Sequence, residues 1–288
     1  MARTPEKAPV TETTGHVWDG IEELNTPLPR WWLYTFYATI LFALGYMVLY
    51  PAVPLLKGAT PGVLGYSTRG EVATEINRVA EANAALDSRL VAAALDDIPK
   101  DPELLQYATA GGGAVFRTFC AQCHGAGAAG VQATGYPNLL DDDWLWGGTL
   151  DDIRATLAHG IRWEADPDTR YSEMPAFADV LSTEEIAAVA EHVLAVSAQE
   201  HDAALAGQGA ALFVENCGGC HGEDAKGLRE FGSPNLTDAI WLRGGSREAI
   251  VAQITAPGNG IMPSWGNRLS EAQVRKVAVY VHGLGGGE

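Results

Sequence analysis

All four cysteines of this chain lie in two copies of one pentapeptide, Cys-x-x-Cys-His. This spacing is the attachment motif of a c-type haem: both thiols add to the porphyrin vinyl groups and the adjacent histidine binds the iron. Two intervening residues place both sulfur atoms on one edge of the macrocycle. The sequence therefore predicts two covalently bound haem c groups. The predicted attachment residues and histidine ligands are Cys120, Cys123 and His124 in the first copy and Cys217, Cys220 and His221 in the second.

Other uses of a Cys-x-x-Cys pair fit this chain less well. A zinc ribbon places its second cysteine pair roughly 15–20 residues after the first, whereas here the offset is 97 residues (217 minus 120). A thioredoxin-like pair lies in a βαβ pattern, and neither copy is flanked by predicted strands. A disulfide scaffold is typical of short secreted chains, and 288 residues can bury a core without one. Zinc remains the alternative to haem.

Two methionines are placed to supply the second axial ligand of each iron. Met174 and Met262 each follow one haem motif and precede a proline, whereas Met1 starts the chain and Met47 lies in an apolar run. A thioether opposite histidine raises the reduction potential and suits electron transfer. Methionine is usually core filler, but the repeated Met-Pro pair favours iron ligation. We expect each methionine to serve the motif before it; an exchange between the two halves stays open.

Histidine is the other candidate for this sixth position. Four histidines lie near the methionines or the closing segments: His159, His192, His201 and His282. We expect most of them to be surface or helix-packing residues, and a bis-histidine iron at one site is the alternative.

The motifs belong to a longer internal repeat. Residues 120–148 align with residues 217–245 without a gap, and they share a Pro-Asn-Leu, a tryptophan and a Gly-Gly. Beyond the methionines the offset falls to 88 (270 minus 182), so the first copy is nine residues longer (97 minus 88) between its Gly-Gly and its methionine. The sequence predicts two tandem domains, residues 108–200 and 201–288.

Helical patterns dominate both copies. A short helix precedes each haem motif, and a capping box opens each closing helix. The predicted helices are residues 112–119, 182–197, 209–216 and 270–283. Neither copy contains a convincing strand, so we predict small all-α domains whose core is largely the haem itself.

This arrangement resembles the class I cytochrome c family over roughly residues 108–285. The resemblance implies that a Gly-x-x-x-aromatic helix crosses the C-terminal helix and that a proline carbonyl binds the proximal histidine. By position these prolines are Pro137 and Pro234, and such a bond would fix the imidazole tautomer; the alternative is an ordinary turn. Trp144 and Trp241 are either donors to a haem propionate or core aromatics.

An apolar segment precedes the repeat. No charged residue occurs from Trp31 to Leu56, and the 20 residues from Trp31 to Tyr50 reach about 30 Å as a helix. Aromatic residues stand at both ends, as at membrane interfaces, and the segment is too long for a signal-peptide core. We predict a single retained membrane anchor at residues 31–56; a buried core helix is the alternative.

The orientation of this anchor follows from the haem chemistry. Positive charges nearly balance across the span, with Arg3, Lys7 and Arg30 before it and Lys57, Arg69 and Arg78 after it. Haem c is attached on the outer side of the bacterial inner membrane. We therefore expect residues 1–30 in the cytoplasm and both haem domains in the periplasm. Residues 57–107 are expected to form a linker and an amphipathic helix, which either contacts a partner subunit or is a solvated spacer.

The chain is strongly acidic, with a net charge of −17. This charge argues against nucleic acid and anionic lipid as partners. An acidic surface attracts a basic redox protein and speeds its encounter, although acidity also simply keeps domains soluble. No catalytic constellation stands out.

The segment before the anchor narrows the resemblance. Residues 16–32, HVWDGIEELNTPLPRWW, are similar to the signature preceding the anchor in the CcoP/FixP subunit family of cbb3-type cytochrome c oxidases. In that family the subunit carries electrons from a cytochrome c donor. They pass to a second membrane-anchored cytochrome c subunit and to the haem–copper subunit, which reduces oxygen and pumps protons. The resemblance implies an electron-transfer subunit that is not an enzyme by itself.

Three other functions stay open at this point. The cytochrome subunit of a different membrane dehydrogenase would share every haem feature. A dihaem peroxidase needs an open iron, which the paired Met-Pro motifs oppose, and a haem-based gas sensor needs an output domain.

Overall fold

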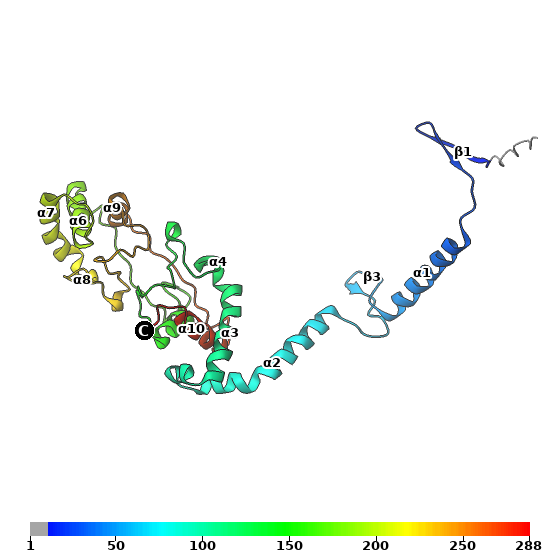
Figure 1. The fold of residues 1–288 in the computed structure, drawn as a ribbon, viewed down its shortest axis with the longest axis horizontal. Helices are drawn as coiled ribbons and strands as arrows, with labels where there is room; N and C mark the ends of the chain where they lie inside the picture. The colour runs from blue at the N-terminus through cyan, green and yellow to red at the C-terminus, as the bar shows by residue number, and fades with distance from the viewer. Residues whose placement is uncertain (1–10) are drawn as a thin grey trace, which may run out of the picture. The chain divides into compact units, whose positions relative to one another are not determined.

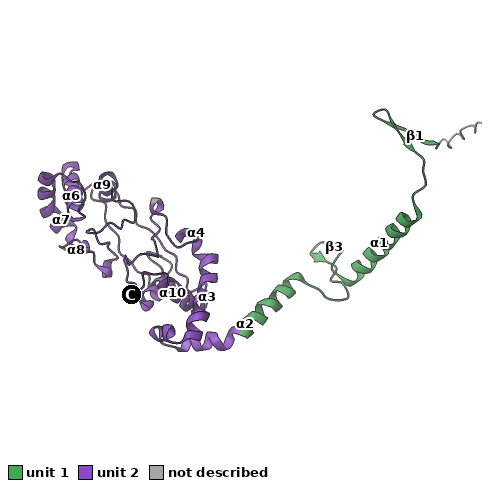
Figure 2. Cartoon of the chain, viewed as in Figure 1, with its two compact units in different colours: residues 1–82 green, residues 83–288 purple. Residues whose placement is uncertain are grey.

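Residues 11–288 are described by a computed structural model in which helices predominate. The chain divides into two compact units, residues 1–82 and 83–288, and the boundary falls inside one long helix (Figure 2). The first ten residues of the predicted cytoplasmic segment 1–30, with Arg3 and Lys7, lie outside the described residues.

The first unit opens with a hairpin that the sequence analysis missed. Strands β1 (Thr13–Trp18) and β2 (Ile21–Leu24) pair antiparallel. Asp19 and Gly20 between them have φ of 47° and 83°, as a two-residue hairpin turn requires. The Asp-Gly pair was therefore the overlooked signal.

The predicted anchor, residues 31–56, is helical only as far as Leu49, in the continuous helix α1 (Arg30–Leu49). Among the described residues it is the one helix long and apolar enough to cross a membrane. None of its residues is buried within the chain, so the alternative of a buried core helix is wrong. A short hairpin follows, formed by β3 (Pro54–Leu55) and β4 (Gly58–Ala59).

The predicted amphipathic helix corresponds to α2 (Thr68–Ala92), which precedes the 3₁₀-helix η1 (Leu95–Lys100). Leu90, near the end of α2, is fully buried, whereas Val72 and Ile76 are 58% and 62% exposed. The guanidinium of Arg275 donates to the carbonyls of Leu90 and Ala93. These bonds satisfy carbonyls at the helix end that have no partner within the helix.

The two repeats of the second unit form matching elements. In the first repeat these are α3 (Pro102–Phe119), α4 (Ala121–His124), η2 (Gln132–Thr134), α5 (Leu150–His159) and α6 (Thr183–Val196). In the second they are α7 (Ala203–Asn216), α8 (Gly218–His221), η3 (Arg229–Phe231), α9 (Arg247–Thr255) and α10 (Glu271–His282). Both predicted capping boxes are confirmed, at Ser182 with Glu185 and at Ser270 with Gln273.

The closing helices are exchanged between the repeats. Helix α10 packs against α3 and α5, whereas α6 packs against α7 and α9 (Figure 1). Glycine permits the close helix crossings: a Cβ at Gly112 would overlap the Lys276 carbonyl, and one at Gly209 the Ala188 carbonyl. Residues 108–200 and 201–288 therefore do not pack as separate domains. The physical reason is the short connection 197–202, which makes α6 the neighbour of α7.

Each exchanged pair of helices closes its own hydrophobic core. Phe116, Ile153, Trp265 and Val277 belong to the core that contains α3 and α10. Phe177, Val189, Phe213 and Ile250 belong to the core that contains α6 and α7. We call these the first and second assembly, after the haem motif that each contains.

Candidate haem sites

Each assembly contains an apolar cavity beside its Cys-x-x-Cys-His helix. The first cavity, of about 220 Å³, is lined by Cys120, Cys123 and His124 together with Met262. The second cavity, of about 260 Å³, is lined by Cys217, Cys220, His221 and Met174. All eight residues singled out from the sequence therefore lie in two groups of four.

The methionines are exchanged relative to the expected pairing. Met174, which follows the first motif in the chain, lies in the second cavity, and Met262 lies in the first. The expectation that each methionine serves the motif before it is wrong in this structure. The cause is again the placement of α6 beside α7, because Met174 precedes α6 and stays in the same assembly.

The first cysteine of each pair, Cys120 or Cys217, caps the end of the preceding helix. Cys120 and Cys217 are buried, and neither pair forms a disulfide. Burial, together with the second thiol of each pair, raises the pKa of Cys120 and of Cys217 to about 11.

The histidines are held by the prolines that the resemblance implied. The Nδ1 atom of His124 lies 3.2 Å from the Pro137 carbonyl oxygen, and that of His221 lies 3.3 Å from the Pro234 oxygen. With Nδ1 donating its proton there, Nε2 keeps a free lone pair. Burial lowers the pKa of both imidazoles, against the opposite effect of the proline bond. The neutral, iron-binding form is thus favoured.

Backbone hydrogen bonds fix the methionine of the first cavity. Ile161 and Met262 form an antiparallel pair, with N–O distances of 2.9 and 3.0 Å. The Trp265 amide donates to the Leu157 carbonyl at 2.9 Å. The loop that carries Met262 is therefore attached to the end of α5.

A side-chain amide fixes the methionine of the second cavity. Asn259 accepts from the Met174 amide at 3.3 Å and donates to the Met174 carbonyl at 3.2 Å. Because Asn259 precedes Met262 in the chain, the two methionine loops are joined to each other as well as to their helices.

The two tryptophans differ in their contacts. The indole N–H of Trp144 donates to the carbonyl of Gly286, so it is not available to a propionate. Each tryptophan lines its own cavity and packs on a glycine, Trp144 on Gly148 and Trp241 on Gly245, where a Cβ would overlap the indole. The core-aromatic interpretation fits Trp144.

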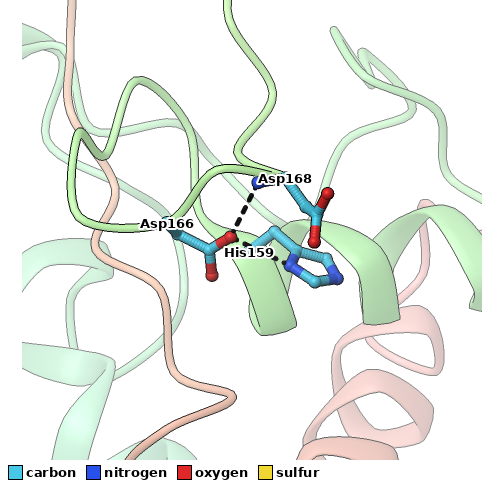
Figure 3. A group of neighbouring side chains, drawn as sticks. All are labelled: His159, Asp166 and Asp168. Carbon is cyan, nitrogen blue, oxygen red and sulfur yellow. Dashed lines mark hydrogen bonds and ion pairs between the residues drawn. The ribbon is translucent and has the colours of Figure 1, made fainter.

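The four other histidines do not line either cavity within residues 11–288. The Nδ1 atom of His159 lies 3.2 Å from the Asp166 carboxylate, which also accepts from the Asp168 amide at 3.0 Å (Figure 3). Burial alone would raise the pKa of Asp166, but these hydrogen bonds lower it below the usual value. These hydrogen bonds stabilise the loop after α5.

Two arginines in the cavity walls escaped the sequence analysis. Arg162 lines both cavities, and Arg243 lines the second. Neither position belongs to a motif or matches an arginine in the other repeat. No sequence signal could have found them, because their position depends on the exchanged packing.

The residues present fit a c-type haem. Each cavity offers two thiols on one helical turn, an imidazole with a free Nε2, a thioether from another loop and largely apolar walls. A haem bound there would supply a one-electron Fe(II)/Fe(III) couple at a potential raised by the thioether. The chain itself would orient the imidazole, keep the methionine in place and exclude water.

Comparisons with known proteins agree with this assignment. The family described as the N-terminal domain of cytochrome oxidase-cbb3, FixP, matches residues 10–57. The family described as cytochrome C oxidase, cbb3-type, subunit III matches residues 108–193 and 204–281. These cytochrome matches favour haem over zinc.

Relatives of the whole chain point to the same family. A cbb3-type cytochrome c oxidase subunit CcoP of Cereibacter sphaeroides is 57% identical over 99% of this chain and 98% of the relative. A subunit CcoP of Rhodobacter capsulatus is 52% identical over the full length of both chains, 100% of each. A subunit FixP of Sinorhizobium medicae is 51% identical over 96% of this chain and 95% of the relative. The chain belongs to the CcoP/FixP family of cbb3-type cytochrome c oxidase subunits.

Proposed function

We propose that this chain carries two covalent haem c groups and relays electrons through them to the other subunits of a cbb3-type oxidase. The observation that carries the proposal is the grouping of a cysteine pair, a histidine and a methionine in each of two apolar cavities. Family membership favours the oxidase over another membrane dehydrogenase. If histidine and methionine both bound the iron of a haem held there, they would leave no position for peroxide or a sensed gas.

The proposed axial ligands are His124 with Met262 and His221 with Met174. The proline bonds hold each imidazole in one tautomer, and the hydrogen-bonded loops hold each thioether. Side chains held in this way would keep their positions when a bound iron changed oxidation state. This rigidity suits a group that gives and takes one electron at a time.

The membrane arrangement is part of the proposal. Helix α1 would span the bacterial inner membrane, with the N-terminus in the cytoplasm and the haem assemblies in the periplasm. The proposed partners are the haem–copper subunit, a second membrane-anchored cytochrome c subunit and a cytochrome c donor. The acidic composition, with a net charge of −17, favours a basic donor.

The test is to purify the chain with its membrane complex and measure the mass of the polypeptide and the metals of the complex. We expect two covalent haems on this chain, together with b-type haem and copper in the complex. The variant Cys217→Ala/Cys220→Ala should lose one haem and slow oxygen consumption with reduced cytochrome c. Zinc without porphyrin, or a complex without copper, would contradict the proposal.

A further inference from the structure

Arg162 occupies a wall that both cavities share. It lies in residues 160–173, the segment between α5 and Met174 in which the first repeat is longer than the second. Its side chain is partly buried. A change in the position or charge of Arg162 is therefore expected to affect both candidate haem sites.

The guanidinium joins the two methionine loops directly. Its Nε atom donates to the Gly260 carbonyl at 2.6 Å, and Nη1 donates to the Ser172 carbonyl at 2.7 Å. Gly260 lies two residues before Met262, and Ser172 lies two residues before Met174. In each loop, the guanidinium thus donates to the carbonyl of the residue two positions before the methionine.

The backbone around Arg162 supports this geometry. Its neighbour Ile161 pairs with Met262, and its own amide donates to the Arg170 carbonyl at 2.8 Å. Arg162 has φ of 51°, in the left-handed region that non-glycine residues seldom occupy. Unusual backbone of this kind persists where the surrounding structure enforces it, commonly at functional sites.

The Arg162 guanidinium has no ion-pair partner among the side chains of residues 11–288, whereas Arg154 and Arg170 each pair with a carboxylate. Burial, with Arg243 nearby, lowers the pKa of Arg162, and Glu173 acts in the opposite direction. An arginine still keeps its proton at neutral pH.

We propose that Arg162 is a positioning residue shared by both haem sites, which holds the two methionine loops and raises both iron potentials together. The inference rests on the proposed ligation by Met174 and Met262. A positive charge near the iron favours Fe(II), and an intact thioether ligand does the same. Loss of Arg162 should therefore lower both potentials.

The decisive variant is Arg162→Met, studied in the intact oxidase complex with Arg154→Met as the matched control. Arg154 is also an arginine at the first assembly, but it pairs with Glu271 and lines neither cavity. The readouts are the methionine–iron charge-transfer absorption and the midpoint potential of each haem. We expect Arg162→Met to weaken the absorption at both haems and lower both potentials, and Arg154→Met to leave both unchanged.

If Arg162→Met does not retain its haems, Arg162→Lys provides a second test. Lysine keeps the charge but cannot hold both carbonyls with one planar group, so the absorption should weaken at both haems with a smaller fall in potential. An effect on one haem alone, or on neither, overturns the shared role. Wild-type protein without any methionine–iron absorption would instead contradict the proposed ligation itself.

Discussion

The first and second assemblies contain the same parts, but the chain reaches them differently. The hydrophobic core of the second assembly is built from one continuous stretch, from Met174 through α6, α7 and α8 to the end of α9. The first joins α3, α4 and α5 to Met262 and α10, so its parts come from both ends of the haem unit. Contacts distant in sequence form more slowly than local ones. We therefore expect the second assembly to be the more autonomous of the two.

Removal of the last helix gives the largest expected effect. Deletion of residues 270–288 removes α10, which covers α3 and supplies Val277 to the first core. We expect this truncation to disrupt the first assembly and its Cys120 haem while the Cys217 haem remains. Haem staining and visible spectra of variants that keep one motif would measure this. Two sequential domains would give the reverse result, with loss of the Cys217 haem.

The helix crossings give a smaller, symmetric test. Gly112→Val should force α10 away from α3, and Gly209→Val should force α6 away from α7, because each Cβ would meet a backbone carbonyl. Overpacking of this kind costs about 1–3 kcal/mol in the free energy of unfolding.

Spectra of the two haems during denaturant unfolding would show which assembly each substitution destabilises. The control is Gly207→Ala, also in α7, where an added Cβ meets no atom within 4 Å. A substitution at Gly112 that weakened only the second assembly would contradict the exchanged packing.

The smallest predicted effect concerns a carboxylate in the first cavity whose matching position in the second cavity is apolar. Asp143 lines the first cavity, and Ile240 stands at the matching place in the second. Burial, reinforced mainly by Asp238, raises the pKa of Asp143 to about 6. Because this value exceeds that of the unfolded chain, ionisation opposes folding, and stability is lost as the pH rises from about 4 to about 6.

Asp143→Asn should remove this loss. After allowance for solvent screening, we expect the free energy of unfolding to rise by about 1 kcal/mol near neutral pH and to stay unchanged below about pH 3. Denaturant unfolding at the two pH values measures the difference, and Asp179→Asn is the control, because Asp179 is exposed and is not among the charges that raise the pKa of Asp143. A gain that is equal at both pH values would show that the charge of Asp143 is not its cause.

Local features of the fold could be predicted from the sequence. The capping boxes at Ser182 and Ser270 fixed the starts of α6 and α10 to within one residue, because they depend on a few neighbouring groups. Helices α5 and α9 were missed, although Thr149 and Ser246 cap them with side-chain bonds to the amide three residues later. These were readable N-cap signals.

Which helices pack against each other was harder to predict than where each helix begins. The short connection 197–202 between α6 and α7 was visible in the sequence and favours antiparallel neighbours. The internal repeat, however, favoured the prediction of two sequential domains. Arg162 could not be predicted at all. Its bond to Gly260 spans 98 residues and exists only because the closing segments are exchanged.

The central claim is that each haem takes its histidine from one repeat and its methionine from the other. The direct measurement uses Cys217→Ala/Cys220→Ala, which leaves the Cys120 haem alone, combined in turn with Met262→Leu and with Met174→Leu. The readout is the methionine–iron charge-transfer absorption of the remaining haem. We predict that Met262→Leu abolishes this absorption and that Met174→Leu preserves it. Loss of the absorption in Met174→Leu, with retention in Met262→Leu, would contradict the account.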